Sequence, residues 1–135
     1  MQYTLKLHKY DIVEANVPSS GSVQDSKGTR PYVIVSNEKG TSCSPIITIL
    51  PLTGVIKKMH LPTHECIEAE TGTGLRKYSM LLGETMQTID KLEVKRRLGR
   101  VTNEGCKNKI NKVCYYSLFY GEDINWGEVL NEKNK

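Results

Sequence analysis

Two residues of the sequence, an arginine and a threonine, combine a polar side chain with a position at the end of an apolar run. Arg30 follows a polar segment rich in Ser, Gly and Asp and precedes an apolar run at 31–35, whereas Thr53 closes a second run that begins at Ile46. A guanidinium held where a polar loop meets an apolar strand can be the working group of an active site, and a threonine hydroxyl can donate or accept a hydrogen bond. Because each residue ends a predicted strand, both can face one rim of a barrel, where functional loops concentrate.

Other interpretations of the candidate residues stay open at this point. Arg30 can instead be a structural cation that pairs with a nearby carboxylate such as Asp25 or Glu38. His64 is the histidine that we would choose as a general base, because imidazole titrates near neutral pH. A lone histidine without a visible partner is, however, more often structural. The sequence contains neither a Gly-rich nucleotide-binding loop nor an H-E-x-x-H metal motif.

Composition excludes several classes of protein. The chain has 135 residues, of which 38% are hydrophobic and 25% charged, as in an ordinary globular domain. Its net charge of +4 mildly favours polyanionic partners. No apolar run approaches the roughly 20 residues of a membrane span, and the first residues do not form a secretory signal, so we expect a cytoplasmic protein. Four cysteines without a C-x-x-C pair are expected to be reduced, packed thiols, at 43, 66, 106 and 114.

The hydrophobic pattern predicts short strands followed by helices. Strands are expected at 11–17, 31–35, 46–53, 64–69, 79–82 and 86–89. Residues 37–44 are predicted to be a turn-rich loop, and Asp90 is predicted to cap a short helix at 91–98 with Leu92, Val94 and Leu98 facing inward. A longer helix begins near Asn103 and ends at Gly121, and its expected inner face is Cys106, Ile110, Val113, Cys114, Ser117 and Leu118.

These elements predict a mainly β fold with helical additions, arranged as a small antiparallel barrel followed by a C-terminal helix. No repeat or linker divides the chain, so we expect one domain over residues 1–135. The tail at 131–135 is expected to be disordered.

Four sequence motifs occur in an order that matches one known family. They are D-I-V at 11–13 with G-S-V-Q at 21–24 and G-T-R-P at 28–31; S-P-I at 44–46 leading to L-T at 52–53; L-P-T-H at 61–64; and S-M-L-L at 79–82 with T-I-D-K at 88–91. Each motif alone is weak, but four in the correct order are specific. Over residues 9–120 the chain resembles the MazF/PemK family of bacterial toxin endoribonucleases.

The resemblance implies an SH3-like (MazF/CcdB-like) barrel that forms a homodimer and binds single-stranded RNA (mRNA) across the dimer groove. It implies a type II toxin whose cognate antitoxin blocks that groove with an acidic tail. Cleavage in this family is sequence-specific and metal-independent, uses no cofactor, and yields a 2′,3′-cyclic phosphate and a 5′-OH. By position, Arg30 and Thr53 are the catalytic residues, and Ser22, Gln24 and Glu84 contact the substrate.

Departures from the family pattern leave two further functions open. Val23 replaces the loop glutamate of the family, two extra residues separate Gln24 from Arg30, and Thr85 stands where the family commonly has glutamine. We therefore expect a changed RNA preference, or a barrel that binds RNA or protein without cleaving it. A gyrase-poisoning toxin of the CcdB kind shares the fold, but the polar and charged residues 127–135 give no positive sign of that target.

Overall fold

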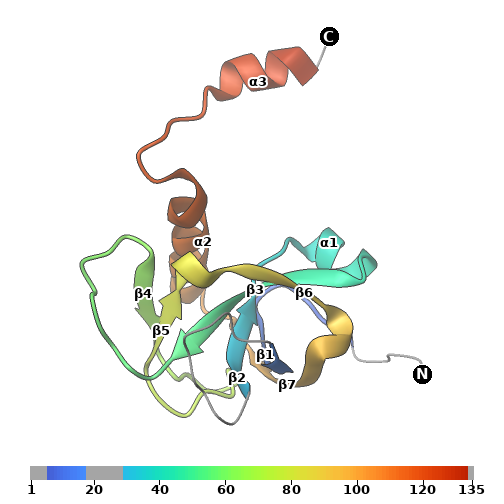
Figure 1. The fold of residues 1–135 in the computed structure, drawn as a ribbon, viewed down its shortest axis with the longest axis vertical. Coiled ribbons are helices and arrows are strands. Elements are labelled where there is room, and N and C mark those ends of the chain that lie inside the picture. Colours follow the sequence, from blue (N-terminus) through green and yellow to red (C-terminus); the bar gives the residue numbers. More distant parts are fainter. Residues whose placement is uncertain (1–5, 18–28, 134–135) are drawn as a thin grey trace.

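A computed structural model describes residues 6–17 and 29–133, which form a strongly curved antiparallel sheet flanked by helices (Figure 1). The sheet has seven strands in the order β4-β5-β3-β2-β1-β7, with β6 also paired to β3. The predicted mainly β fold with a C-terminal helix is confirmed. The strands are β1 Asp11–Asn16, β2 Thr29–Ile34, β3 Ile46–Thr53, β4 His64–Ile67, β5 Ser79–Leu82, β6 Gln87–Asp90 and β7 Val94–Arg100.

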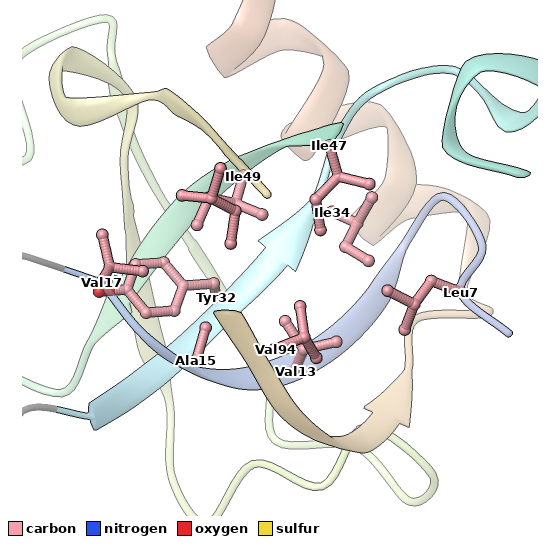
Figure 2. Packing of buried hydrophobic residues seen from close by; sticks show 10 residues of the cluster. Leu7, Val13, Ala15, Val17, Tyr32, Ile34, Ile47, Ile49 and Val94 are labelled. Carbon is pink, nitrogen blue, oxygen red and sulfur yellow. The ribbon is translucent and has the colours of Figure 1, made fainter. Parts of the chain in front are cut away.

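Strand β3 organises the sheet because it pairs with three others. Ile47 pairs with Ile89 of β6, the middle of β3 pairs with β2, and Thr53 pairs with Met80 of β5. Successive strand residues point to opposite faces, so β3 feeds two separate hydrophobic clusters. Figure 2 shows the first cluster, in the concave side of the curved sheet. It comprises Leu7, Val13, Ala15, Val17, Tyr32, Ile34, Ile47, Ile49, Ile89 and Val94.

Helix α2, Glu104–Phe119, covers the second cluster on the other face of the sheet. Asn103 caps this helix by accepting the N–H of Cys106 at 2.9 Å, and Gly121 follows its end with a φ of +82°. Cys106, Ile110 and Val113 are buried as predicted, but Leu118 is 64% exposed and does not belong to the inner face. The predicted start and stop of the long helix are therefore confirmed, and its inner face is shorter than expected.

Residues 91–98 do not form the predicted short helix. Lys91–Glu93 make a single 3-10 turn (η2), in which Leu92 is exposed, and β7 then pairs with β1. Leu, Lys, Arg and Glu all favour a helix, but a helix here would leave the outer backbone groups of β1 without partners. The hydrogen bonds to β1 therefore outweigh the local preference.

The predicted loop at 37–44 contains a short helix, α1, Glu38–Cys43. Asn37 caps it by accepting the N–H of Gly40 at 2.7 Å. Six residues that include Gly, Thr and Ser are too few to show helical periodicity, so the cap was the only local signal. A 3-10 turn, η1 Gly83–Thr85, links β5 to β6.

Helix α3, Trp126–Lys133, extends away from the barrel (Figure 1). Its apolar residues Trp126, Val129 and Leu130 are exposed, so α3 contributes nothing to either hydrophobic cluster. The sequence patterns predicted no helix here. Among the described residues, no helix is long and apolar enough to cross a membrane.

Candidate functional site

The ends of β2 and β3 bring together the two residues that the sequence singled out. Tyr32 pairs with Pro51 across the antiparallel strands. Arg30 lies two residues before Tyr32 and Thr53 lies two residues after Pro51, so both lie at the same end of the β2–β3 pair, beyond its last paired residues. Residues two apart along a strand share a face, and here that face is the one that carries the first hydrophobic cluster. Arg30 and Thr53 therefore belong to one rim of the barrel.

The hydroxyl of Thr53 is held in place by the backbone that follows it. Thr53 Oγ1 accepts the N–H of Val55 at 3.1 Å, an interaction that orients a short polar side chain at the end of a strand. A hydroxyl that accepts one hydrogen bond still has its own proton to donate. Thr53 is half-buried, so that proton can reach a phosphate oxygen at the rim.

Arg30 is half-buried and forms no ion pair with any residue that the structure describes. Glu38, one of its possible structural partners, is engaged elsewhere. It contacts His8 Nδ1 at 2.7 Å and accepts the N–H of Lys9 at 3.0 Å, and these hydrogen bonds lower the pKa of Glu38. Asp25, the other possible partner, lies outside the described residues. Within the described chain, the Arg30 guanidinium is thus available to an anion.

His64 is buried and ties two surface segments together. Its Nε2 lies 2.8 Å from Glu84 Oε2, and its Nδ1 lies 3.2 Å from the backbone oxygens of both Lys57 and Lys58. All of these neighbours are oxygen acceptors, so each ring nitrogen of His64 faces a hydrogen-bond acceptor. We call this arrangement the His64 clamp: it joins the β3–β4 loop to the η1 turn. This arrangement agrees with the structural interpretation of the histidine.

Glu84 is the acidic member of the clamp. Burial opposes its ionisation, but hydrogen bonds from His64, from its own backbone and from Thr63 outweigh that effect and lower the pKa of Glu84. Thr63 Oγ1 donates to Glu84 at 3.2 Å. The structure thus brings Glu84 to His64 and Thr63, and within the described residues no hydrogen bond or ion pair joins it to Arg30 or Thr53. The other two predicted substrate contacts, Ser22 and Gln24, lie outside the described residues.

A cavity of about 470 Å³ on the opposite face of the same strand ends was missed from the sequence. Three cations line it, and one of them, Lys77, lies directly against Gly54. The only sequence signal was the pair Arg76-Lys77 before β5. All four cysteines are free, and nowhere in the described part of the chain do three His, Cys, Asp or Glu side chains gather as metal ligands would.

Comparisons with known proteins agree with the geometry of the barrel. Residues 8–113 match the family model described as PemK-like, MazF-like toxin of type II toxin-antitoxin system. Endoribonuclease MazF of Staphylococcus saprophyticus is 35% identical over 108 residues, which cover 79% of this chain and 88% of that protein.

Solved structures share the fold at lower identity. A mycobacterial endoribonuclease in complex with its cognate antitoxin superposes with a TM-score of 0.64 at 21% identity, over 83% of this chain and 94% of that one. MazF from Deinococcus radiodurans gives a TM-score of 0.64 at 18% identity, over 85% and 97% of the two chains. The family match ends within α2, so α3 lies beyond it.

Proposed function

The chain belongs to the PemK/MazF family of type II toxins and is an endoribonuclease. We propose that it cleaves single-stranded RNA without a metal ion and that Arg30 and Thr53 are its catalytic residues. One observation carries the assignment of the site. Arg30, a cation without a carboxylate partner among the described residues, lies at the same end of the β2–β3 pair as the oriented hydroxyl of Thr53. A fixed cation beside a hydroxyl donor suits a phosphate that gains negative charge.

The proposed reaction uses the RNA's own nucleophile. The 2′-oxygen next to the scissile phosphate attacks phosphorus and loses its proton, the bond from phosphorus to the 5′-oxygen breaks, and that oxygen gains a proton. The products are a 2′,3′-cyclic phosphate and a 5′-OH. The phosphorane-like transition state concentrates negative charge, which the Arg30 guanidinium stabilises through two parallel N–H donors. Thr53 holds a phosphate oxygen or the 2′-OH through its free hydroxyl proton.

The proposed partners follow from the same family. We expect a cognate antitoxin to block the RNA-binding rim and a second copy of the chain to complete it, since one small barrel offers little surface for several nucleotides. The antitoxin-bound mycobacterial relative and the net charge of +4 support these expectations.

The test is RNA turnover at catalytic enzyme concentration in EDTA, with the new ends mapped on a long unstructured RNA. We expect cleavage to continue in EDTA, and one 2′-deoxyribose at the mapped site to abolish it, because the nucleophile is then missing. Activity that disappears in EDTA and returns with Mg²⁺ would contradict the proposed chemistry. Stoichiometric binding without turnover would favour the alternative of a binding module.

A further inference from the structure

The cavity of about 470 Å³ shares its strand ends with the proposed catalytic pair. Pro31, Leu52 and Gly54 line it, and these residues alternate along β2 and β3 with Arg30 and Thr53. Alternating residues point to opposite faces of a sheet. The cavity and the pair therefore lie on the two sides of one edge, where β2 begins and β3 ends.

The lining of the cavity carries an excess of positive charge. It includes Arg76, Lys77 and Arg96, against the single carboxylate of Glu14. Glu14 is already bonded to Arg96, whose Nε lies 2.9 Å from Glu14 Oε1. Arg76 and Lys77 form no ion pair with any other residue in the described ranges. An anion in the cavity would supply the counter-charge that these two cations lack among the described residues.

The end of the Lys77 side chain lies over Gly54. A Cβ atom at Gly54 would lie 2.1 Å from Lys77 Cε and 2.7 Å from its Nζ, so a larger residue at this position would displace the end of the lysine. The ammonium group therefore lies beside the residue that directly follows Thr53. Ser79 Oγ donates to the backbone oxygen of Lys77 at 2.9 Å, which ties the backbone at Lys77 to the start of β5.

The segment that carries Arg76 and Lys77 is anchored on β7. Gly74 has a φ of +78°, and a Cβ there would lie 2.3 Å from the backbone oxygen of Leu98, so the two backbones touch. The N–H of Arg100 donates to Gly72 O at 2.8 Å, and the buried Thr73 hydroxyl donates to the backbone of the same turn. The cations therefore project from a packed turn, which reduces the entropy lost on binding a ligand.

We propose that Lys77, assisted by Arg76, binds an RNA backbone phosphate next to the scissile one. This inference rests on the proposed function, because it assumes that the scissile phosphate lies at Arg30 and Thr53. An RNA strand that crosses the ends of β2 and β3 presents successive phosphates to the two faces of that edge. Lys77 is thus a substrate-binding residue outside the reacting group, and its contact is equal in the bound substrate and in the transition state.

The test compares Lys77→Gln with Lys39→Gln, a control that removes the same charge elsewhere. Lys39 lies on α1, at the other end of β3. Both variants are assayed as full-length protein on a short RNA that contains the mapped site. We expect Lys77→Gln to raise KM about 10-fold, the effect of one charged hydrogen bond, with kcat nearly unchanged. The affinity of the variant for RNA should also depend less on salt: the slope of log affinity against log salt concentration should be shallower by about 0.7. Lys39→Gln should change neither quantity.

Two further measurements locate the phosphate. In a series of RNAs, each with one neutral methylphosphonate linkage, one non-scissile position should raise the KM of the parent protein but not that of Lys77→Gln. Gly54→Ala, which displaces the lysine and keeps its charge, should raise KM alone and add nothing in the Lys77→Gln background. An unchanged KM for Lys77→Gln would overturn the inference. So would a raised KM for Lys77→Gln if every neutral linkage that raises the KM of the parent also raises that of the variant. A parent protein that cleaves no RNA would instead refute the proposed function.

Discussion

Thr53 and Arg30 differ in how the protein holds them. The hydroxyl of Thr53 is oriented by the N–H of Val55, whereas the Arg30 guanidinium has no carboxylate partner within the described residues. The sequence predicted both as site residues, because each combines a side chain that can bind phosphate with the end of an apolar run. The sequence did not single out Lys77, because its proximity to Gly54 comes from two segments that lie apart in the sequence.

At Thr53, two substitutions separate the hydroxyl from the methyl group. Thr53→Ala should lower the cleavage rate about 10- to 100-fold, the effect of losing one hydrogen bond to a charged group. Thr53→Ser should lose less, because the hydroxyl can still accept the N–H of Val55 and donate its proton. Single-turnover rates on the mapped RNA measure both. Equal rates for Thr53→Ala and the parent would show that the hydroxyl has no part in the reaction.

At the scale of elements, the strands around β3 were predictable and the pairing partners at the sheet edge were not. The runs at 46–53 and 79–82 are apolar enough to be strands on composition alone. Residues 94–100 are rich in helix formers and become β7 only because β1 offers an unpaired edge. A long-range hydrogen-bond ladder of this kind leaves no local signal in the sequence. The His64 clamp was not predicted for the same reason, since it joins two segments that lie apart in the sequence.

The His64 clamp makes part of the stability depend on pH. The pKa of Glu84 is lowered from its ordinary value of 4.5 in the folded protein, so its contribution is complete above pH 4.5 and is lost as pH falls through the lower folded value. Melting temperatures of the parent and of Glu84→Gln should therefore differ most above pH 4.5 and converge as the pH falls below it.

A second background shows whether His64 is the partner. In His64→Gln, the same Glu84→Gln change should have a smaller effect on the melting temperature at neutral pH, because the main hydrogen bond to the carboxylate is gone. A difference in melting temperature between the parent and Glu84→Gln that does not decrease as the pH falls below 4.5 would contradict the clamp.

The whole molecule combines a family barrel with an additional helix. The family match covers residues 8–113, and α3 extends away from the barrel with Trp126, Val129 and Leu130 exposed (Figure 1). The mainly β class was predictable because short β-branched runs dominate the first ninety residues. Helix α3 was not predictable from the sequence, because a helix with exposed apolar residues and no place in either hydrophobic cluster has no core-facing pattern to detect.

We expect the protein to be a dimer in solution. A two-fold dimer would double the 15.2 kDa chain to about 30 kDa in light scattering. A chain truncated after Tyr120 should keep twice its own mass, because α3 lies outside the family barrel. A monomer at micromolar concentration that still cleaves RNA would contradict this prediction.

The most direct test of the account is the single-turnover cleavage rate of Arg30→Ala. We predict a loss of about 100-fold or more with unchanged mass and melting temperature, the effect of removing one preorganised charge from the transition state. Arg30→Lys should recover little, because a point charge does not reproduce the two-pronged donor. His64→Ala should retain more activity than Arg30→Ala. An Arg30→Ala protein that cleaves at the parent rate, together with an inactive His64→Ala, would contradict the account and make the histidine the catalytic residue.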